Sequence, residues 1–313
     1  MSSPNPFLFQ ERLHVLVTGG TGFIGTTLVR QMLDAGHAVT VLARKPARAT
    51  ALFGGKARCI GSLDALDAST ASVAWDAVIN LAGAPVVGPR WTPKRQRELL
   101  ASRVGTTRAL TDWLATAAHK PEVWIQASAI GFYGVREPAE ALTEESLAGA
   151  GFMAELCAQW ERAARPAADA GVRQVVLRLG VVWGPGGALP LMLLPIRLGM
   201  GGRLGSGRQV ISWIQLDDVL RLIARSLRDP GMQGIYNAVA PEATSQAAFA
   251  ATAGELLGRP IWLHLPARPI RWLAGEMAQL FVDGQRVVPQ RLTEAGFKFE
   301  YPTVQSALRH LLS

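Results

Sequence analysis

The sequence has few of the residues that would build a metal site or a disulfide framework. Its 313 residues include two cysteines and five histidines, and Cys59 and Cys157 lie far apart with no CxxC spacing. Clustered thiolates and imidazoles are the usual ligands of zinc, so we expect no metal site. Unpaired cysteines are typical of reducing compartments, and we therefore expect a cytoplasmic protein.

Long apolar runs are also missing. No uncharged run of about 18 apolar residues occurs, so we expect no membrane segment. Residues 1–15 lack a basic region followed by an apolar stretch, and no secretory signal is expected. The net charge is +8, but most arginines are scattered and no nucleic-acid motif accompanies the densest group, at 94–108. We expect anionic small molecules, not nucleic acid, as partners.

What the sequence has is a strong alternation of apolar runs and helical patterns over its first 180 residues. Alternation of this kind predicts a doubly wound parallel sheet with helices on both faces. The predicted strands are 13–18, 38–42, 57–60, 76–80, 122–127 and 173–179, and the predicted helices are 23–36, 93–118 and 152–170. After residue 183, glycine-rich loops separate helical segments near 187–198, 216–228, 244–257 and 266–281.

A glycine motif lies between the first predicted strand and the first predicted helix. Gly19, Gly22 and Gly25 have the spacing of a dinucleotide-binding turn, although an ordinary glycine-rich loop is the alternative. In such a turn the glycines allow a tight reversal, a close approach to pyrophosphate and close packing of helix on strand. The anion lies at the positive end of the helix. We predict cofactor binding by Gly19, Thr21, Gly22, Phe23, Ile24 and Gly25.

The fold prediction follows from these patterns. We expect an α/β protein in which residues 1–182 form a Rossmann-type doubly wound parallel sheet. Residues 183–313 are expected to form a smaller, mainly helical carboxy-terminal capping region, whose loops close over the cofactor crevice.

No acidic residue follows the second predicted strand. That position favours NAD when it is acidic, whereas here it carries Arg44, Lys45 and Arg48. A guanidinium can bind a 2′-phosphate through two parallel hydrogen bonds. We therefore predict NADP (NADPH) as the cofactor, held by Arg44; a solvated basic turn is the alternative. The small residues after strand 76–80 are predicted to line the cofactor, namely Leu81, Ala82 and Gly83.

Several segments together resemble those of a known superfamily. TGGTGFIG (18–25) and NLAG (80–83) resemble the cofactor loop and fourth-strand motif of extended short-chain dehydrogenases/reductases. RWTPK (90–94) with Ser102 and Arg103, SAIGFYG (128–134) and the segment 275–302 are similar to the NAD-dependent epimerase/dehydratase-like "epimerase family" branch with its characteristic C-terminal domain. The resemblance implies a Rossmann fold with a small capping domain and NADP binding, but no settled substrate.

The usual catalytic residues of that superfamily are absent. Its members use a Ser or Thr with Tyr-x-x-x-Lys, in which the lysine lowers the tyrosine pKa. The hydroxyl position falls on Ala129, the tyrosine position on Met153 and the lysine position on Cys157. None of these can donate a proton as tyrosine and lysine do, so the standard mechanism cannot run unchanged.

Other groups are candidates for the proton chemistry. We name Tyr133 and Ser128 as catalytic candidates, with a packed aromatic in a turn as the alternative for Tyr133. Glu144 and Glu145 could reach the same cleft or could start a helix. Cys157 is a nucleophile or, more simply, a small core residue. A non-catalytic NADP(H)-binding sensor or assembly protein is the alternative to an NADP-dependent oxidoreductase or epimerase.

For the substrate we single out residues in two loops. Arg90 and Trp91 could clamp an anionic or planar group with Arg103, or Trp91 could cap a helix while Arg103 forms a structural ion pair. Arg208 and Trp213 fall where superfamily members contact substrate. We expect a small polar substrate, perhaps nucleotide-sugar-like, of unknown identity. A homodimer through helices 93–118 and 152–170 is left open.

Overall fold

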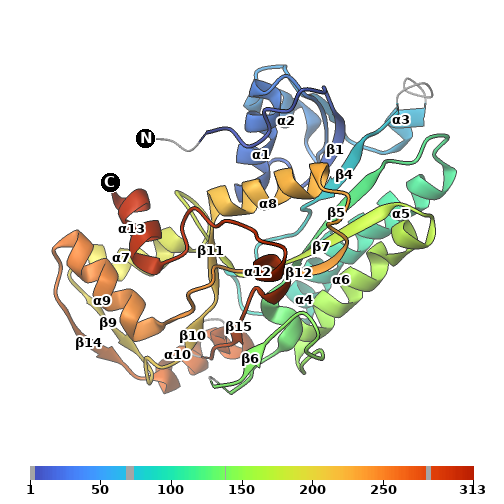
Figure 1. The fold of residues 1–313 in the computed structure, drawn as a ribbon. Helices are drawn as coiled ribbons and strands as arrows, with labels where there is room; N and C mark the ends of the chain where they lie inside the picture. Colours follow the sequence, from blue (N-terminus) through green and yellow to red (C-terminus); the bar gives the residue numbers. More distant parts are fainter. Residues whose placement is uncertain (1–3, 68–73, 138, 280–282) are drawn as a thin grey trace.

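The computed structural model describes residues 4–67, 74–137, 139–279 and 283–313. Within them a seven-stranded sheet has the order β12-β7-β5-β4-β1-β2-β3, with every neighbouring pair parallel (Figure 1). The prediction of a Rossmann-type sheet is confirmed. The strands are β1 (His14–Thr18), β2 (Ala38–Leu42), β3 (Arg58–Ile60), β4 (Ala77–Asn80), β5 (Val123–Ala129), β7 (Arg173–Leu179) and β12 (Gly234–Ala238).

Helices cover both faces of the sheet because successive strand residues point to opposite sides. Val15 and Val17 pack against one set of helices, and Leu16 packs against the other. The first set is α1 (Phe23–Asp34), α2 (Pro46–Leu52) and α8 (Leu216–Arg228). The second set includes α5 (Thr106–Thr116) and α6 (Phe152–Asp169), and α5 continues α4 (Pro93–Leu100) through the π-helical turn Ala101–Gly105.

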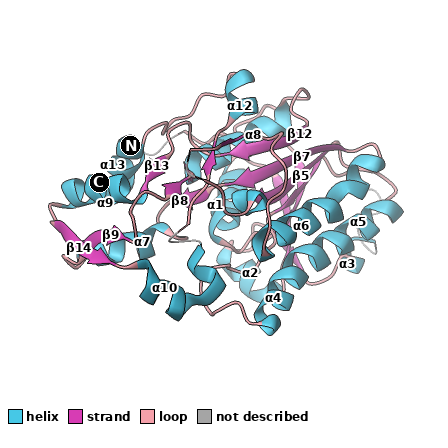
Figure 2. Ribbon diagram, turned by 90° about the horizontal axis from the view of Figure 1, so that it is seen from below, coloured by secondary structure: helices cyan, strands magenta, loops and turns pink. Residues whose placement is uncertain are grey.

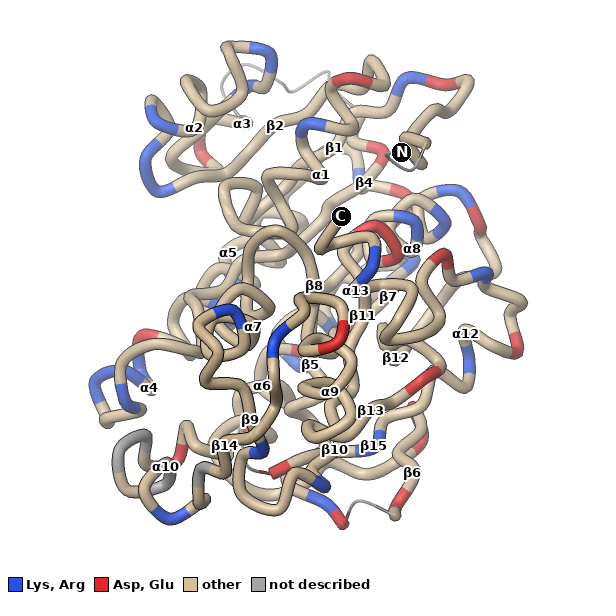
Figure 3. Tube along the Cα trace, turned by 90° about the vertical axis from the view of Figure 1, so that its left-hand side faces the viewer, with Lys and Arg blue, Asp and Glu red and all other residues tan. Residues whose placement is uncertain are grey.

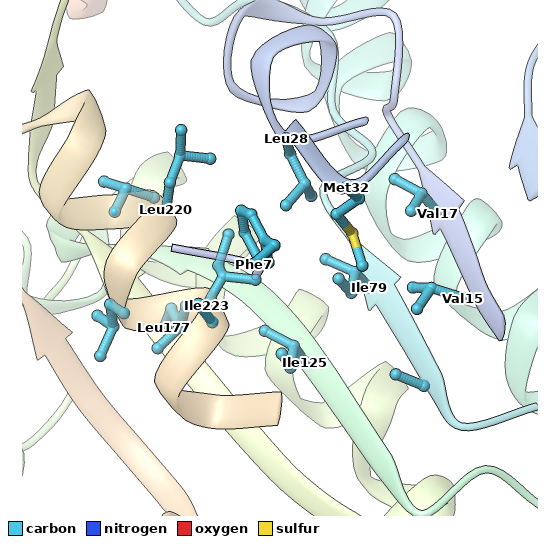
Figure 4. Close-up of a cluster of buried hydrophobic side chains, with 14 of the residues drawn as sticks. Phe7, Val15, Val17, Leu28, Met32, Ile79, Ile125, Leu177, Leu220 and Ile223 are labelled. Carbon is cyan, nitrogen blue, oxygen red and sulfur yellow. The ribbon is translucent and has the colours of Figure 1, made fainter. Parts of the chain in front are cut away.

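The larger core lies between the sheet and helices α1 and α8. Figure 4 shows Leu28 and Met32 from α1 and Leu220 and Ile223 from α8, with Phe7 between the two helices. Five strand residues form the floor of this cluster: Val15, Val17, Ile79, Ile125 and Leu177. This packing holds the carboxyl ends of the strands in register, and the candidate site is built there.

The carboxy-terminal region consists of helices and short strands, as expected. Its helices are α7 (Leu189–Arg197), α9 (Gln246–Leu257), α10 (Ala267–Ala274), α12 (Gln290–Glu294) and α13 (Val304–Leu312). Two-stranded sheets join β8 (Val181–Trp183) to β11 (Trp213–Gln215), β9 (Gly201–Leu204) to β14 (Ile261–Leu265), β10 (Val210–Ile211) to β13 (Thr244–Ser245) and β6 (Ala141–Leu142) to β15 (Arg286–Val287). Figure 2 shows this region beside the sheet, with α7, α9, β9 and β14 opposite α4, α5 and α6.

The sheet extends past the predicted boundary at residue 182. Strand β12 pairs with β7, and α8 packs on the main core, so both belong to the sheet layer although they lie in the second half of the chain. The sequence analysis did not identify β12. The predicted helix 266–281 is divided into α10 and the 3-10 turn Gly275–Ala278, and its residues 280 and 281 lie outside the described residues.

Charged residues are distributed over many elements. Figure 3 shows Lys and Arg interspersed with Asp and Glu along the chain, with basic residues on α4 and around α2. Among the described residues we find no helix whose length and hydropathy would let it span a bilayer.

Candidate cofactor and substrate site

A cavity of about 1820 Å³ lies at the carboxyl ends of the parallel strands. Its walls include residues that directly follow β1, β2, β4, β5 and β7, which is where ligands bind in doubly wound folds. Residues of the carboxy-terminal region form the opposite wall. Sites for one small ligand usually enclose roughly 300–1,000 Å³, so this cavity has room for a dinucleotide and a second molecule.

The glycine turn after β1 is shaped by close backbone contacts. Gly19 has a φ of +68°, and a Cβ there would lie 2.9 Å from the amide nitrogen of Ala82. A Cβ on Gly25 would lie 2.7 Å from the Cα of Gly20. Because these neighbours are backbone atoms, neither position accepts a side chain without moving the strand or the helix. Gly25 therefore acts through packing, and it is not part of the cavity wall.

The amino terminus of α1 is open toward the cavity. Its N-cap is Gly22, no side chain caps it, and its first turn contains no acidic residue. The unsatisfied N–H groups and the helix dipole make such a terminus an anion site. Five of the predicted cofactor residues line the cavity here: Gly19, Thr21, Gly22, Phe23 and Ile24. The donor set therefore fits a pyrophosphate.

The ribose end of the cavity carries one of the three basic residues that follow β2. Arg44 is exposed and lines the cavity, whereas Lys45 and Arg48 are not part of its wall. Leu81, Ala82 and Gly83, after β4, form the adjacent wall as predicted. A guanidinium at this position fits a 2′-phosphate.

The wall where superfamily members place their catalytic groups is apolar. Ala129, Ile130, Gly131 and Met153 line the cavity there. Cys157, in the lysine position, is buried behind Gly131, and burial raises the pKa of its thiol to about 12. A thiol with this pKa stays protonated near neutral pH, which excludes it as a nucleophile there.

The structure places both candidate catalytic residues, Tyr133 and Ser128, behind this wall. Tyr133 is fully buried, donates its hydroxyl hydrogen to Asn237 Oδ1 at 2.6 Å and accepts from Arg178 Nη1 at 3.0 Å. Ser128 donates to Glu161 Oε1 at 2.6 Å. The short 3-10 turn Ile130–Tyr133 directs the phenol inward, and burial raises its pKa.

Behind the same wall lies a buried ion pair. Arg178 on β7 donates from Nε and Nη2 to the two carboxylate oxygens of Glu161 on α6, both at 2.9 Å. Its guanidinium also lies 3.5 Å from the ring centroid of Phe132. Glu144 is buried nearby and accepts from the amide nitrogen of Asn237 at 2.9 Å. These contacts join β5, α6, β7 and β12 into one polar network.

The four predicted substrate residues are not part of the cavity wall either. Trp91 is buried and donates from Nε1 to the Val86 carbonyl oxygen at 2.9 Å. Trp213 is buried in a parallel stack on Trp183, with ring centroids 4.2 Å apart. Arg90 and Arg208 are both exposed. The tryptophans serve the core, because their large apolar surfaces favour burial.

Arg103 does line the cavity, close to the vacant lysine position. It follows α4 in the π-helical turn and donates from Nη2 to the Ala84 carbonyl oxygen at 3.0 Å. Its guanidinium lies 5.1 Å from the ring centroid of Trp160. Among the described residues no carboxylate lies within 4.0 Å of it, so it is not the structural ion pair considered above. Burial lowers its pKa, but an arginine remains charged.

One part of the cavity is lined by residues that come after position 178 in the sequence. We call this part the apolar chamber. The polar groups on its wall include Gln285, on the segment before β15. The sequence analysis assigned no ligand-binding role to any residue of the chamber. It expected only that the loops of this region close over the cofactor crevice. Its apolar lining includes Leu191, Met192, Pro195, Val210, Ile211 and Phe249.

Comparison with known proteins gives two matching family models. The model of the NAD dependent epimerase/dehydratase family matches residues 15–238, and a domain of unknown function (DUF1731) matches residues 265–311. The epimerase family protein SDR39U1 of Bos taurus is 38% identical over 312 residues, which cover 96% of this chain and all of the relative.

Solved structures have the same fold. The human epimerase family protein SDR39U1, crystallised with NADPH, is 36% identical with a TM-score of 0.84, over 96% of this chain and 99% of that one. MoeE5 in complex with UDP-glucuronic acid and NAD is 25% identical with a TM-score of 0.74, over 96% and 97%. Among the described residues of this chain, no cluster of three or more His, Cys, Asp or Glu could hold a metal ion.

Proposed function

Because this chain belongs to the NAD dependent epimerase/dehydratase family, we propose that it binds NADP(H) along its glycine turn and acts as an oxidoreductase or epimerase on a small molecule. The observation that carries the proposal is the single cavity that runs from Arg44, past the open terminus of α1, to the apolar chamber. One cavity of this size can hold both reactants side by side.

The choice of NADP(H) is supported by the residues at the ribose end. Arg44 offers a cation where an NAD-binding protein has a carboxylate. The human relative was crystallised with NADPH and is similar over nearly its whole length. A bound nicotinamide dinucleotide supplies hydride transfer, and the protein supplies binding, orientation and electrostatics.

The chain's own contribution to the chemistry differs from that of the usual triad. Arg103 is the cation nearest the vacant lysine position, and its charge is not cancelled by a described carboxylate. A fixed cation in a partly desolvated cavity stabilises negative charge that develops on a reacting oxygen. We assign this role to Arg103, with Ala129, Met153 and Gly131 keeping water from the wall.

The apolar wall also favours a second candidate, a non-catalytic NADP(H)-binding sensor or assembly protein. Without tyrosine and lysine on the wall, proton transfer has no side-chain donor there. The two candidates differ in turnover. A reductase loaded with NADPH consumes several equivalents when a protein-free metabolite extract is added, whereas a sensor consumes none.

The first experiment is calorimetric titration of the purified protein with NADPH and, separately, with NADH. We expect NADPH to bind at least tenfold more tightly, a difference of about 1.4 kcal/mol. Binding of neither dinucleotide would contradict the proposal as a whole. Equal affinity would contradict only the assignment of NADP(H) over NAD(H).

The cytoplasmic location stays a prediction, as does the homodimer. Neither is needed for the proposed activity, because the described cavity is built by one chain.

A further inference from the structure

The apolar chamber carries almost no charge. Among its described lining residues, those after position 178, no lysine, arginine or histidine occurs, and Asp283 is the one charged group. An acidic side chain repels phosphate. The chamber wall therefore offers no favourable electrostatic contact to a diphosphate.

The opposite wall does not make up for this. Arg95 lines the cavity, but it is paired with Glu98 at 3.1 Å and donates to the Pro85 carbonyl oxygen at 2.6 Å. Arg103 is one further cation on this wall. Arg44 lies at the distant ribose end. Two additional phosphate charges would therefore be buried without a matching pair of cations, which is unfavourable.

Most polar side chains of the chamber are already engaged within the protein. Ser212 donates from Oγ to the Gln285 carbonyl oxygen at 2.7 Å and accepts from the Val287 amide at 3.0 Å. Gln246 donates to the Gly202 carbonyl oxygen and accepts from the Leu204 amide. Gln285 is engaged less fully, because its side-chain oxygen is buried without a hydrogen-bond partner in the described structure. A buried polar atom of this kind is satisfied when a ligand group pairs with it.

The rim of the chamber extends its apolar character to the surface. Leu191 lines the chamber and yet is 59% exposed, so it lies at the mouth. Leu194 follows three residues later on α7 and is also exposed. Side chains three and four residues apart share one helix face, so they form an apolar stripe leading outward from the mouth. Exposed apolar patches of this kind mark ligand or partner sites.

We propose that the apolar chamber binds an uncharged, mainly apolar small molecule that carries one hydroxyl or carbonyl group, and that it does not bind a nucleoside diphosphate sugar. The polar group pairs with Gln285, and the apolar body packs against Ile211 and Phe249. The inference rests on the proposed function, since it identifies the substrate class of the same cavity. It replaces the nucleotide-sugar-like substrate expected from the family resemblance.

The test uses the NADPH-loaded protein and two sets of probes. Nile red, an uncharged apolar dye, reports occupancy of the chamber by its fluorescence, and 1-decanol serves as the competitor. UDP, UDP-glucose and UDP-glucuronic acid are titrated in parallel by calorimetry. We expect 1-decanol to displace the dye, and the three uridine nucleotides neither to displace it nor to give heat at millimolar concentration.

Two leucine variants, one in α7 and one directly after it, test where 1-decanol binds. Leu191→Arg places a charge at the mouth and removes an apolar contact, and we expect it to weaken 1-decanol binding about tenfold. Leu198→Arg is the matched control, since Leu198 directly follows α7 and is as exposed as Leu191 but is not part of the cavity wall, and it should leave binding unchanged. Neither residue is buried, so both variants should fold.

The outcomes separate this inference from the proposed function. Displacement of the dye by UDP-glucose would overturn the inference, as would equal effects of the two leucine variants on 1-decanol binding. Neither result would affect the conclusion that NADPH binds. Loss of NADPH binding by the unmodified protein would instead remove the proposed function on which the inference rests. Gln285→Leu adds a further check. It should weaken 1-decanol but leave the affinity for decane unchanged.

Discussion

At the cofactor end of the cavity, backbone N–H groups and the Arg44 side chain face inward, whereas in the apolar chamber leucine, isoleucine and phenylalanine side chains face inward. The ion pair of Arg178 and Glu161 lies behind the apolar wall. The cofactor end of the cavity therefore favours binding of a charged ligand. At the other, polarity serves mainly to hold the fold together, with Arg103 as the cation between the two.

This difference teaches where the family resemblance is informative. The cofactor turn keeps the family pattern, because pyrophosphate recognition depends on backbone geometry that glycine alone provides. On the apolar wall, Met153 and Cys157 occupy the positions at which the family resemblance implies tyrosine and lysine. A shared fold does not transfer a shared substrate, since function lies in the site. Four predictions test the contrast.

The largest effect is expected from the ion pair behind the wall. Arg178→Met leaves the Glu161 carboxylate mostly buried without its partner, which should lower the free energy of unfolding by about 3–5 kcal/mol. Urea denaturation measures this, and NADPH affinity should not change. The double variant with Glu161→Met should recover part of the loss. A variant that stays fully stable but binds NADPH poorly would show that the pair serves the cofactor end instead.

The next effect concerns Arg44 at the cofactor end. Arg44→Glu replaces the cation with a carboxylate, which repels a 2′-phosphate, and NADPH affinity should fall about 100-fold, or roughly 2.7 kcal/mol. NADH affinity should not fall, as measured by calorimetry, because a carboxylate at this position can accept from the ribose 2′-hydroxyl. Arg48→Glu makes the same charge change on α2, away from the cavity wall, and is the control. Equal losses in the two variants would point to a general field rather than to a phosphate contact.

A smaller effect follows from Tyr133. Tyr133→Phe leaves Asn237 Oδ1 and one Arg178 N–H buried without a partner, so unfolding should become easier by about 1–3 kcal/mol. NADPH binding and turnover of a substrate should be retained. Loss of turnover without loss of stability would restore Tyr133 as the proton donor and would place polar chemistry on the apolar wall.

The effect that is smallest near neutral pH is the pH dependence contributed by Cys157. Its pKa is about 12 in the folded protein against an ordinary value of 9.0, so between these values the unfolded chain has lost a proton that the native state keeps. Stability is therefore unaffected below pH 9 and falls as the pH rises toward 12. Cys157→Ala should flatten that part of the stability profile. Thiol labelling at mildly alkaline pH should modify Cys59 first, because Cys59 is only partly buried.

Much of the fold could be predicted because its signals are local. Strands 38–42 and 173–179 were predicted at their observed bounds, and α8 was predicted as residues 216–228. The glycine spacing identified the turn because three glycines at this spacing, between a strand and a helix, form a local sequence pattern. Strand β12 (Gly234–Ala238) was missed, since it begins with a glycine and contains a polar Asn237, and its place in the sheet comes from pairing with β7.

The side chains of the site were harder to predict. Tyr133 and Trp213 are residue types that suit either a site or a core, and distant partners decide between the two. Asn237 lies 104 positions from Tyr133, and the stack on Trp213 comes from Trp183 on a separate strand. Arg103 was singled out from the sequence. Its lack of a carboxylate partner among the described residues depends on how α4 packs beside the cavity wall. The direction of a side chain and the identity of its partner depend on the tertiary structure.

The late position of β12 also affects how the protein is made on the ribosome. Chains grow from the amino terminus, so β7 is complete some 55 residues before the strand that pairs with its outer edge. During that interval β7 presents an unpaired edge, and the core face that α8 later covers is open to water. Slow synthesis between β7 and β12 thus prolongs the stage at which nascent chains can join edge to edge. For the same reason, a recombinant fragment that ends at residue 182 should aggregate rather than fold.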